Sequence, residues 1–333
     1  MGDTPIDKAA KAIGHAAGTV AKAVGAIEGA VEKRLDKFGN AVVDGVRHLE
    51  ERLGAPHLLR RDDAGRSPAQ FTLYLRIGRG GFSQSKTGVY VPEKLSPRGK
   101  VNLILYLHGN KLRVVNAKDT IEEIWGKDAG EKTGKLVFPL REDLNESGKQ
   151  FILIAPTLGA QDQGIGEIGT NLDFYLEQVM LALVAYGGFP DLPVGDIIIA
   201  GHSGAGGRML ALASGTNSYK NNIKEIWGFD TLLKGTEGDW RSWAVGHSSQ
   251  TKVYVYYWAY GDASLLLAKD TAGVDSVYVM KADSKAIAKA DSGEPHDFIL
   301  KRHWRERLDN IGSPSQSDIK GREESRAEAK KRN

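Results

Sequence analysis

The most informative absence in this 333-residue chain is cysteine, of which it has none. Without thiols the chain can form no disulfide, no thiolate metal site and no cysteine nucleophile. The chain also has little excess charge of either sign, because 45 basic and 42 acidic residues leave a formal net charge of +3. So small an excess gives no electrostatic reason to expect a nucleic-acid partner, and we predict none.

Long apolar runs are missing as well. No stretch approaches the roughly 20 residues that a membrane-spanning helix needs, and the N-terminus lacks the uninterrupted apolar core of a secretory signal. Metal-binding patterns such as H-E-x-x-H or a cluster of His and Asp are not found either. We therefore expect a globular protein without metal or cofactor, either cytoplasmic or exported without a signal peptide.

The chain is organised around residues 196–213, DIIIAGHSGAGGRMLALA. Its apolar first part predicts a strand, and its last part predicts a buried helix. Ser203 lies at the turn between them, with Gly201 two residues before it and Ala205 two residues after it. A serine at the apex of a sharp strand-to-helix turn needs small neighbours at those two places, because the backbone approaches closely there. The turn predicts an accessible Ser203 hydroxyl, with the N–H of Gly204 placed to bind an oxyanion.

This turn resembles the nucleophile elbow of the α/β-hydrolase superfamily, whose pattern is usually G-x-S-x-G; here Ala205 replaces the last glycine. The resemblance covers about residues 70–310. It implies an α/β-hydrolase fold, that is, a mostly parallel eight-stranded sheet flanked by helices. It also implies that a serine nucleophile, an acid and a histidine follow one another in that chain order. The alternative is a glycine-rich structural turn in which Ser203 has no catalytic role.

Apolar runs rich in β-forming residues predict the strands, and helical patterns separate most of them. The predicted strands are 71–77, 87–91, 101–107, 151–155, 197–200, 223–229, 253–260 and 277–280. Helices are predicted near 120–125 and 140–145, at 172–186, after the serine turn, from 239, at 265–269 and at 298–308. The alternation from the third strand onward predicts a largely parallel sheet, with functional groups beyond the carboxyl ends of its strands.

Three titratable residues follow predicted strands and complete the resemblance. Asp230 follows the sixth strand, Asp262 follows the seventh, and His296 lies in a loop after the eighth. The resemblance makes Ser203 the nucleophile, His296 the general base and one of the two aspartates the acid that orients the base. We prefer Asp262, because the seventh strand is the commonest place for the acid in the family, and keep Asp230 as the alternative acid. His202 adjoins the serine, but in an elbow its side chain should point away from it.

A second glycine-containing turn, His108-Gly109-Asn110, follows the third predicted strand. In the hydrolase family such a pair of His and Gly begins the loop that supplies the second oxyanion donor. The resemblance therefore implies that the backbone N–H groups of Gly204 and Asn110 bind the oxyanion. We interpret the side chain of His108 as structural, bonding within its own loop.

Residues 164–169, GIGEIG, match the dinucleotide-binding pattern G-x-G-x-x-G. That pattern requires its first glycine at the very end of a strand. Residues 156–163 separate the motif from the preceding predicted strand, so we reject a nucleotide site and expect a loop beside the pocket.

The two ends of the chain differ from its middle. Residues 5–53 place apolar residues at steps of three and four, which is typical of an amphipathic helix. We expect an N-terminal helical segment and linker over 1–67, a catalytic domain over 68–311 and a polar tail over 312–333 that is disordered or forms a frayed helix. The simpler interpretation is that residues 5–53 pack on the catalytic domain or self-associate. The more specific interpretation is that they contact a membrane surface or an export apparatus. The oligomeric state stays open.

These features together predict a serine hydrolase that cleaves an ester of a small molecule or a lipid through an acyl-enzyme on Ser203. The preference for an ester depends on the habits of the family. A peptidase or amidase of the same fold is the alternative within this chemistry. A non-catalytic binding protein that keeps the hydrolase fold is the alternative outside it.

Overall fold

The computed structural model describes residues 56–63, 70–77, 86–109, 125, 138–157, 171–215, 217–231, 235–258, 261–282 and 295–332. The predicted N-terminal helix over 5–53, the glycine motif 164–169 and, apart from Trp125, the predicted helix near 120–125 lie outside these residues. Among the described helices, none combines the length and the apolar character that crossing a bilayer requires.

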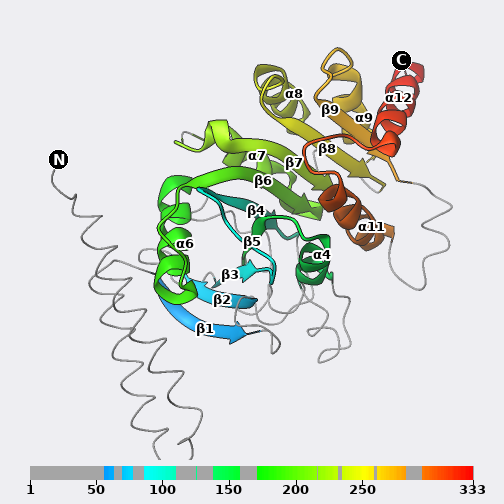
Figure 1. Ribbon diagram of the computed structural model, residues 1–333. Helices are drawn as coiled ribbons and strands as arrows, with labels where there is room; N and C mark the ends of the chain where they lie inside the picture. Colours follow the sequence, from blue (N-terminus) through cyan, green and yellow to red (C-terminus); the bar gives the residue numbers. More distant parts are fainter. Residues whose placement is uncertain are drawn as a thin grey trace, which may run out of the picture.

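The described strands form one nine-stranded sheet (Figure 1). In chain order they are β1 His57–Asp63, β2 Phe71–Arg76, β3 Lys86–Val91, β4 Val101–Leu107, β5 Phe151–Pro156, β6 Val194–His202, β7 Ile223–Phe229, β8 Lys252–Tyr257 and β9 Val277–Lys281. Their order across the sheet is β1-β2-β3-β5-β4-β6-β7-β8-β9. Pairing is antiparallel from β1 to β5 and parallel from β5 through β9. The predicted α/β-hydrolase fold is confirmed, with one strand more than expected.

Helices cover both faces of this sheet (Figure 1). Those described are α4 Leu140–Ser147, α6 Leu172–Gly187, α7 Gly206–Ser214, α8 Glu237–Gly246, α9 Gly261–Asp270, α11 Pro295–Asp309 and α12 Gln316–Lys331. Helices α6 to α9 share one hydrophobic core with the sheet, while α4 and α11 share a second core on the opposite face. Burial on both faces explains why the central strands β4 and β6 are almost continuously apolar.

The predicted strands do not include β1, because its sequence has the polar character of a linker. It pairs with β2 at the edge of the sheet. Its charged residues neutralise each other: Arg60 Nε lies 2.6 Å from Asp62 Oδ1, and Arg61 Nε lies 2.8 Å from Asp63 Oδ1. Charged side chains on an edge strand discourage pairing with another chain, so a polar sequence is compatible with a strand here.

The prediction of a disordered or frayed tail over 312–333 is wrong, because α12 is a docked helix that packs against β9 and α9. The helix begins with a capping box, in which the Ser315 hydroxyl accepts from the N–H of Asp318 and the Asp318 carboxylate accepts from the N–H of Ser315. Gly321 allows close approach, since a Cβ there would lie 2.8 Å from Cγ of Met280. The helix docks with few apolar residues, which is why its sequence lacks an apolar stripe.

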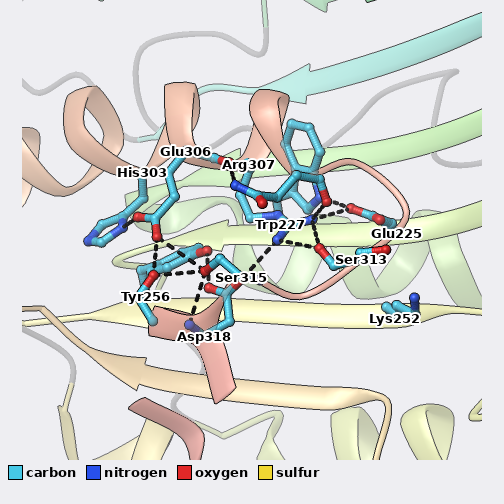
Figure 2. Close-up of polar contacts among 12 residues, drawn as sticks. Glu225, Trp227, Lys252, Tyr256, His303, Glu306, Arg307, Ser313, Ser315 and Asp318 are labelled. Atoms are coloured by element: carbon cyan, nitrogen blue, oxygen red, sulfur yellow. Dashed lines mark hydrogen bonds and ion pairs between the residues drawn. The ribbon is translucent and has the colours of Figure 1, made fainter. Parts of the chain in front are cut away.

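A buried ion cluster ties α11 and α12 to the sheet (Figure 2). The Arg307 side chain is fully buried and contacts Glu225 of β7 at 3.0 Å and Asp318 of α12 at 2.9 Å. Its guanidinium carbon also lies 3.6 Å from the ring centroid of Tyr254. A buried charge is tolerated only when it is paired and hydrogen-bonded, so these contacts must be kept for α12 to stay docked.

Candidate active site

Ser203 lies where β6 ends and the chain turns through the short 3-10 helix Ser203–Ala205 into α7. Its φ angle is +56°, in the left-handed region that residues with a Cβ rarely adopt. Gly201 explains how the turn closes, because a Cβ at this position would lie 2.8 Å from Cβ of Ala205 and 2.4 Å from Sδ of Met209. The small residues around the serine are therefore a steric requirement of this turn.

Asp230 follows the neighbouring strand β7 and has a φ of +45°. Strands β6 and β7 are parallel and in register, with His202 opposite Phe229. The next residue on each strand is Ser203 and Asp230 respectively, so the two leave the sheet side by side at its carboxyl edge. Residues held in such strained backbone conformations gather at functional sites.

His296, in the first turn of α11, is joined to Asp230. Its Nδ1 lies 2.6 Å from Oδ2 of Asp230, whose side chain is fully buried. The other carboxylate oxygen accepts from the backbone N–H of Trp258 at 2.7 Å, which fixes the plane of the carboxylate. Since an ionised carboxylate can only accept, Nδ1 of His296 carries the proton and Nε2 is the nitrogen left to act as a base.

The preference for Asp262 as the acid is corrected by this geometry. Strand β8 already ends at Tyr257, and Asp262 lies in the first turn of α9. The Asp262 side chain is 93% exposed, and its Oδ1 lies 2.7 Å from a guanidinium nitrogen of Arg332. The carboxylate therefore faces solvent and the end of α12, whereas Asp230 is the aspartate that holds His296.

The loop after β4 passes directly against the serine. A Cβ on Gly109 would lie 2.4 Å from Cβ of Ser203 and 3.0 Å from its Oγ, so only glycine fits there. The neighbouring Asn110, predicted to supply an oxyanion N–H, lies outside the described residues. Gly204, which carries the other predicted donor, directly follows Ser203 in the 3-10 turn.

His108, interpreted as structural, is 1% exposed. Its Nδ1 lies 2.7 Å from the carbonyl oxygen of Gly109, so the ring donates within its own loop. The carbonyl oxygen of His108 accepts from the guanidinium of Arg208 on α7 at 3.4 Å. Burial lowers the pKa of Arg208 to about 10, which still leaves it charged at neutral pH. These contacts fix the loop beside Ser203 from two sides.

His202 is a site residue to which sequence reasoning gave no role. The ring is 5% exposed, and its Nε2 lies 3.1 Å from the backbone carbonyl oxygen of His296. The two imidazole rings lie 4.4 Å apart, with 31° between their planes. Side chains alternate along a strand, so the residue before the serine faces α11, and this alternation is the signal that could have identified it.

Within the described part of the chain, no three His, Asp or Glu side chains are arranged to hold a metal ion. The absence of metal and cofactor remains a prediction from the sequence, and the arrangement of Ser203, His296 and Asp230 suits chemistry that uses side chains alone.

No protein-family model matches the chain, and no curated protein matches its sequence. Solved structures do match it. An S-formylglutathione hydrolase from Agrobacterium tumefaciens has a TM-score of 0.45 and 11% identity, over 76% of this chain and 97% of that one. A mutant feruloyl esterase module from Clostridium thermocellum, complexed with sinapinate, has a TM-score of 0.45 and 10% identity; the match covers 79% of this chain and 97% of that one. A puromycin-hydrolysing peptidase from Mycobacterium tuberculosis has a TM-score of 0.41 and 12% identity; the match covers 76% of this chain and 41% of that one. These likenesses are too distant to carry a function to this chain.

Proposed function

We propose that this protein is a serine hydrolase that cleaves an ester through an acyl-enzyme on Ser203, with His296 as the general base and Asp230 as the acid that orients it. The observation that carries the proposal is the 2.6 Å contact between Nδ1 of His296 and Oδ2 of Asp230, beside a strained serine at the end of the adjacent strand. A serine hydroxyl is a weak nucleophile, so it needs such a base within reach.

The first step follows from the proton positions. Nε2 of His296 takes the proton of the Ser203 hydroxyl while Oγ attacks the carbonyl carbon of the ester. The buried carboxylate of Asp230 stabilises the imidazolium that forms, and the Trp258 N–H keeps that carboxylate aligned. His296 then gives the proton to the leaving alcohol, and an acyl group stays on Ser203.

The second step reverses the roles with water. His296 takes a proton from the water that attacks the acyl carbon. It then gives this proton to Oγ of Ser203 as the bond between Oγ and the acyl carbon breaks, so the acid product leaves and the hydroxyl is restored. In both steps the developing oxyanion would be bound by the N–H of Gly204 and, by resemblance to the hydrolase family, by that of Asn110. One such donor is typically worth about 3 kcal/mol of barrier height.

The substrate is proposed as an ester of a small molecule or a lipid. A peptidase or amidase would use the same residues, and the choice of an ester depends on the resemblance alone. A non-catalytic protein of this fold is disfavoured because the strain at Ser203 and Asp230 would then serve no purpose.

Labelling with a fluorophosphonate probe tests the proposal, because the probe reacts with a serine that a base has activated. Wild type should be labelled, while Ser203→Ala and His296→Ala should not. A panel of esters of graded acyl length, with matched amides, would then identify the substrate class. Folded wild-type protein that is not labelled would support the non-catalytic alternative.

A further inference from the structure

We propose that His202 is a positioning residue, which holds His296 in its catalytic orientation by donating a hydrogen bond to the carbonyl oxygen of that residue. The inference rests on the proposed function, because it gives His202 a role in keeping the base in place. It goes beyond the serine, histidine and aspartate themselves, since His202 acts through His296.

The direction of the hydrogen bond follows from its acceptor. A backbone carbonyl can only accept, so Nε2 of His202 carries the proton that points to the oxygen of His296, 3.1 Å away. This contact fixes the backbone of His296, while the bond between its Nδ1 and Asp230 fixes its ring. With the backbone and the ring both held, Nε2 of His296 keeps a single direction relative to the serine that follows His202 in the chain.

Packing keeps His202 itself rigid. The ring of Phe138 lies 5.6 Å away in an edge-on arrangement, and the ring of His296 lies 4.4 Å away. His202 is also the last residue of β6, so its backbone is held in the sheet against β7. A donor of this kind is pre-organised and loses little freedom when it binds its acceptor.

The charge state of His202 suits this role. The groups that face its ring are His296 and Asp297 of α11, Asp230 after β7, and His108 after β4. Burial in the first place, and then the proximity of His296, lower the pKa of His202 to about 3. His202 therefore remains neutral at neutral pH and adds no second positive charge beside the imidazolium that His296 becomes during catalysis.

The test separates the hydrogen bond from the packing of the ring. His202→Phe keeps an aromatic ring and removes the donor, while His202→Gln places an amide N–H near the position of Nε2. His202→Asn carries an amide too short to reach the carbonyl, so it can replace the Phe variant if that protein does not fold. Ile226→Val, in the core on the other face of the sheet, controls for a general loss of packing.

The rate of fluorophosphonate labelling is measured for each folded variant over a range of probe concentrations. We expect the maximal labelling rate to fall about tenfold in His202→Phe and His202→Asn, with the probe concentration at half-maximal rate unchanged. His202→Gln and Ile226→Val should stay within about twofold of wild type. A loss of rate without a loss of probe affinity is the signature of a displaced base.

Two results would overturn the inference while leaving the proposed function intact. One is a labelled wild type with a His202→Phe variant that reacts equally fast. The other is an equal loss in His202→Phe and His202→Gln, which would make the ring contact the important one. A wild type that is not labelled at all would instead defeat the proposed function.

Discussion

Ser203 and Asp230 are the two non-glycine residues with positive φ in the described part of the chain, at +56° and +45°, and they follow adjacent, paired strands. Strain of this kind costs about 1–3 kcal/mol per residue. Both strained residues are parts of the proposed site, the nucleophile and the acid. We infer that the fold tolerates this local loss of stability because the strained backbone directs the two side chains beyond the edge of the sheet.

Relief of that strain should be measurable at Ser203. Ser203→Gly should unfold at a higher urea concentration than Ser203→Ala, because glycine adopts a positive φ without a Cβ clash. We expect a difference of about 0.5–1 kcal/mol in the free energy of unfolding, after the larger chain entropy of glycine in the unfolded state is deducted. Both variants lack the hydroxyl and should be inactive. A Ser203→Gly variant that is less stable than Ser203→Ala by the entropic cost of glycine alone, about 0.5–1 kcal/mol, would show that the turn stores no strain at this residue.

The two candidate acids should differ sharply. Asp230→Asn removes the charge that stabilises the imidazolium and favours the wrong tautomer of His296, so kcat on an ester substrate should fall about 10³ to 10⁴-fold. Asp262→Asn only disturbs an exposed contact with Arg332 and should keep kcat within about twofold. The comparison requires steady-state kinetics on both variants. A large loss in Asp262→Asn alone would restore the original preference from the sequence.

Gly109 should tolerate no side chain. A Cβ there would push Ser203 aside, and a displacement of about 1 Å in a catalytic group can cost about 100-fold in rate. Gly109→Ala is therefore expected to lose about 100-fold in fluorophosphonate labelling. Gly207→Ala in α7 is the matched control, since a Cβ at that position meets no atom within 4 Å. Similar labelling rates in the two variants would contradict the close contact of the loop with the serine.

His202 should make the protein sensitive to acid. Its pKa is lowered from 6.5 to about 3 by burial, so between these values the unfolded chain binds a proton that the folded chain does not. Stability therefore rises with pH across this window and falls on acidification, by about 2 kcal/mol between pH 7 and pH 5. Urea unfolding at both pH values should show this loss in wild type, and a smaller loss in His202→Gln.

The acidic group Glu306 titrates below that interval. The pKa of Glu306 is lowered to about 2, mainly by the hydrogen bond from His303. The stability that Glu306 contributes is complete above its unfolded pKa, near 4.5, and is lost as the pH falls towards 2. Glu306 therefore keeps its contribution from pH 7 to pH 5, and the difference between wild type and His202→Gln in this interval isolates the contribution of the His202 ring. Identical pH dependence in wild type and His202→Gln would show that the buried ring is not the source.

The buried ion cluster should be essential for the C-terminal helix. Arg307→Met leaves Glu225 and Asp318 buried without their cation, and breaking a buried pair in this way typically costs about 3–5 kcal/mol. We expect a correspondingly lower urea midpoint and faster proteolysis of α12. Lys320→Ala, which removes an exposed pair with Glu324 on the same helix, should leave both unchanged. Equal midpoints for the two variants would mean that α12 docks without the cluster.

The sequence predicted those elements whose conformation depends on residues only a few positions apart. The apolar runs of the central strands and the small residues around Ser203 act over a few positions, and they predicted the parallel sheet and the serine turn. The polar sequence of α12 led to a wrong prediction because this helix depends on contacts with residues far away in the chain. That helix is held by Asp318, which reaches Arg307 on α11 and Tyr256 on β8, and contacts this distant along the chain leave no periodic signal.

The same division holds within the candidate site. The fold class, the turn that presents Ser203 and the candidate residues after the predicted strands could all be read from short stretches of sequence. The tertiary structure was needed to show that His296 contacts Asp230 and not Asp262, and that Nε2 of His202 reaches the carbonyl oxygen of His296. Both aspartates follow predicted strands, so the sequence alone cannot distinguish them. Which carboxylate faces the histidine depends on where β8 ends, how α9 begins and how α11 packs across β7.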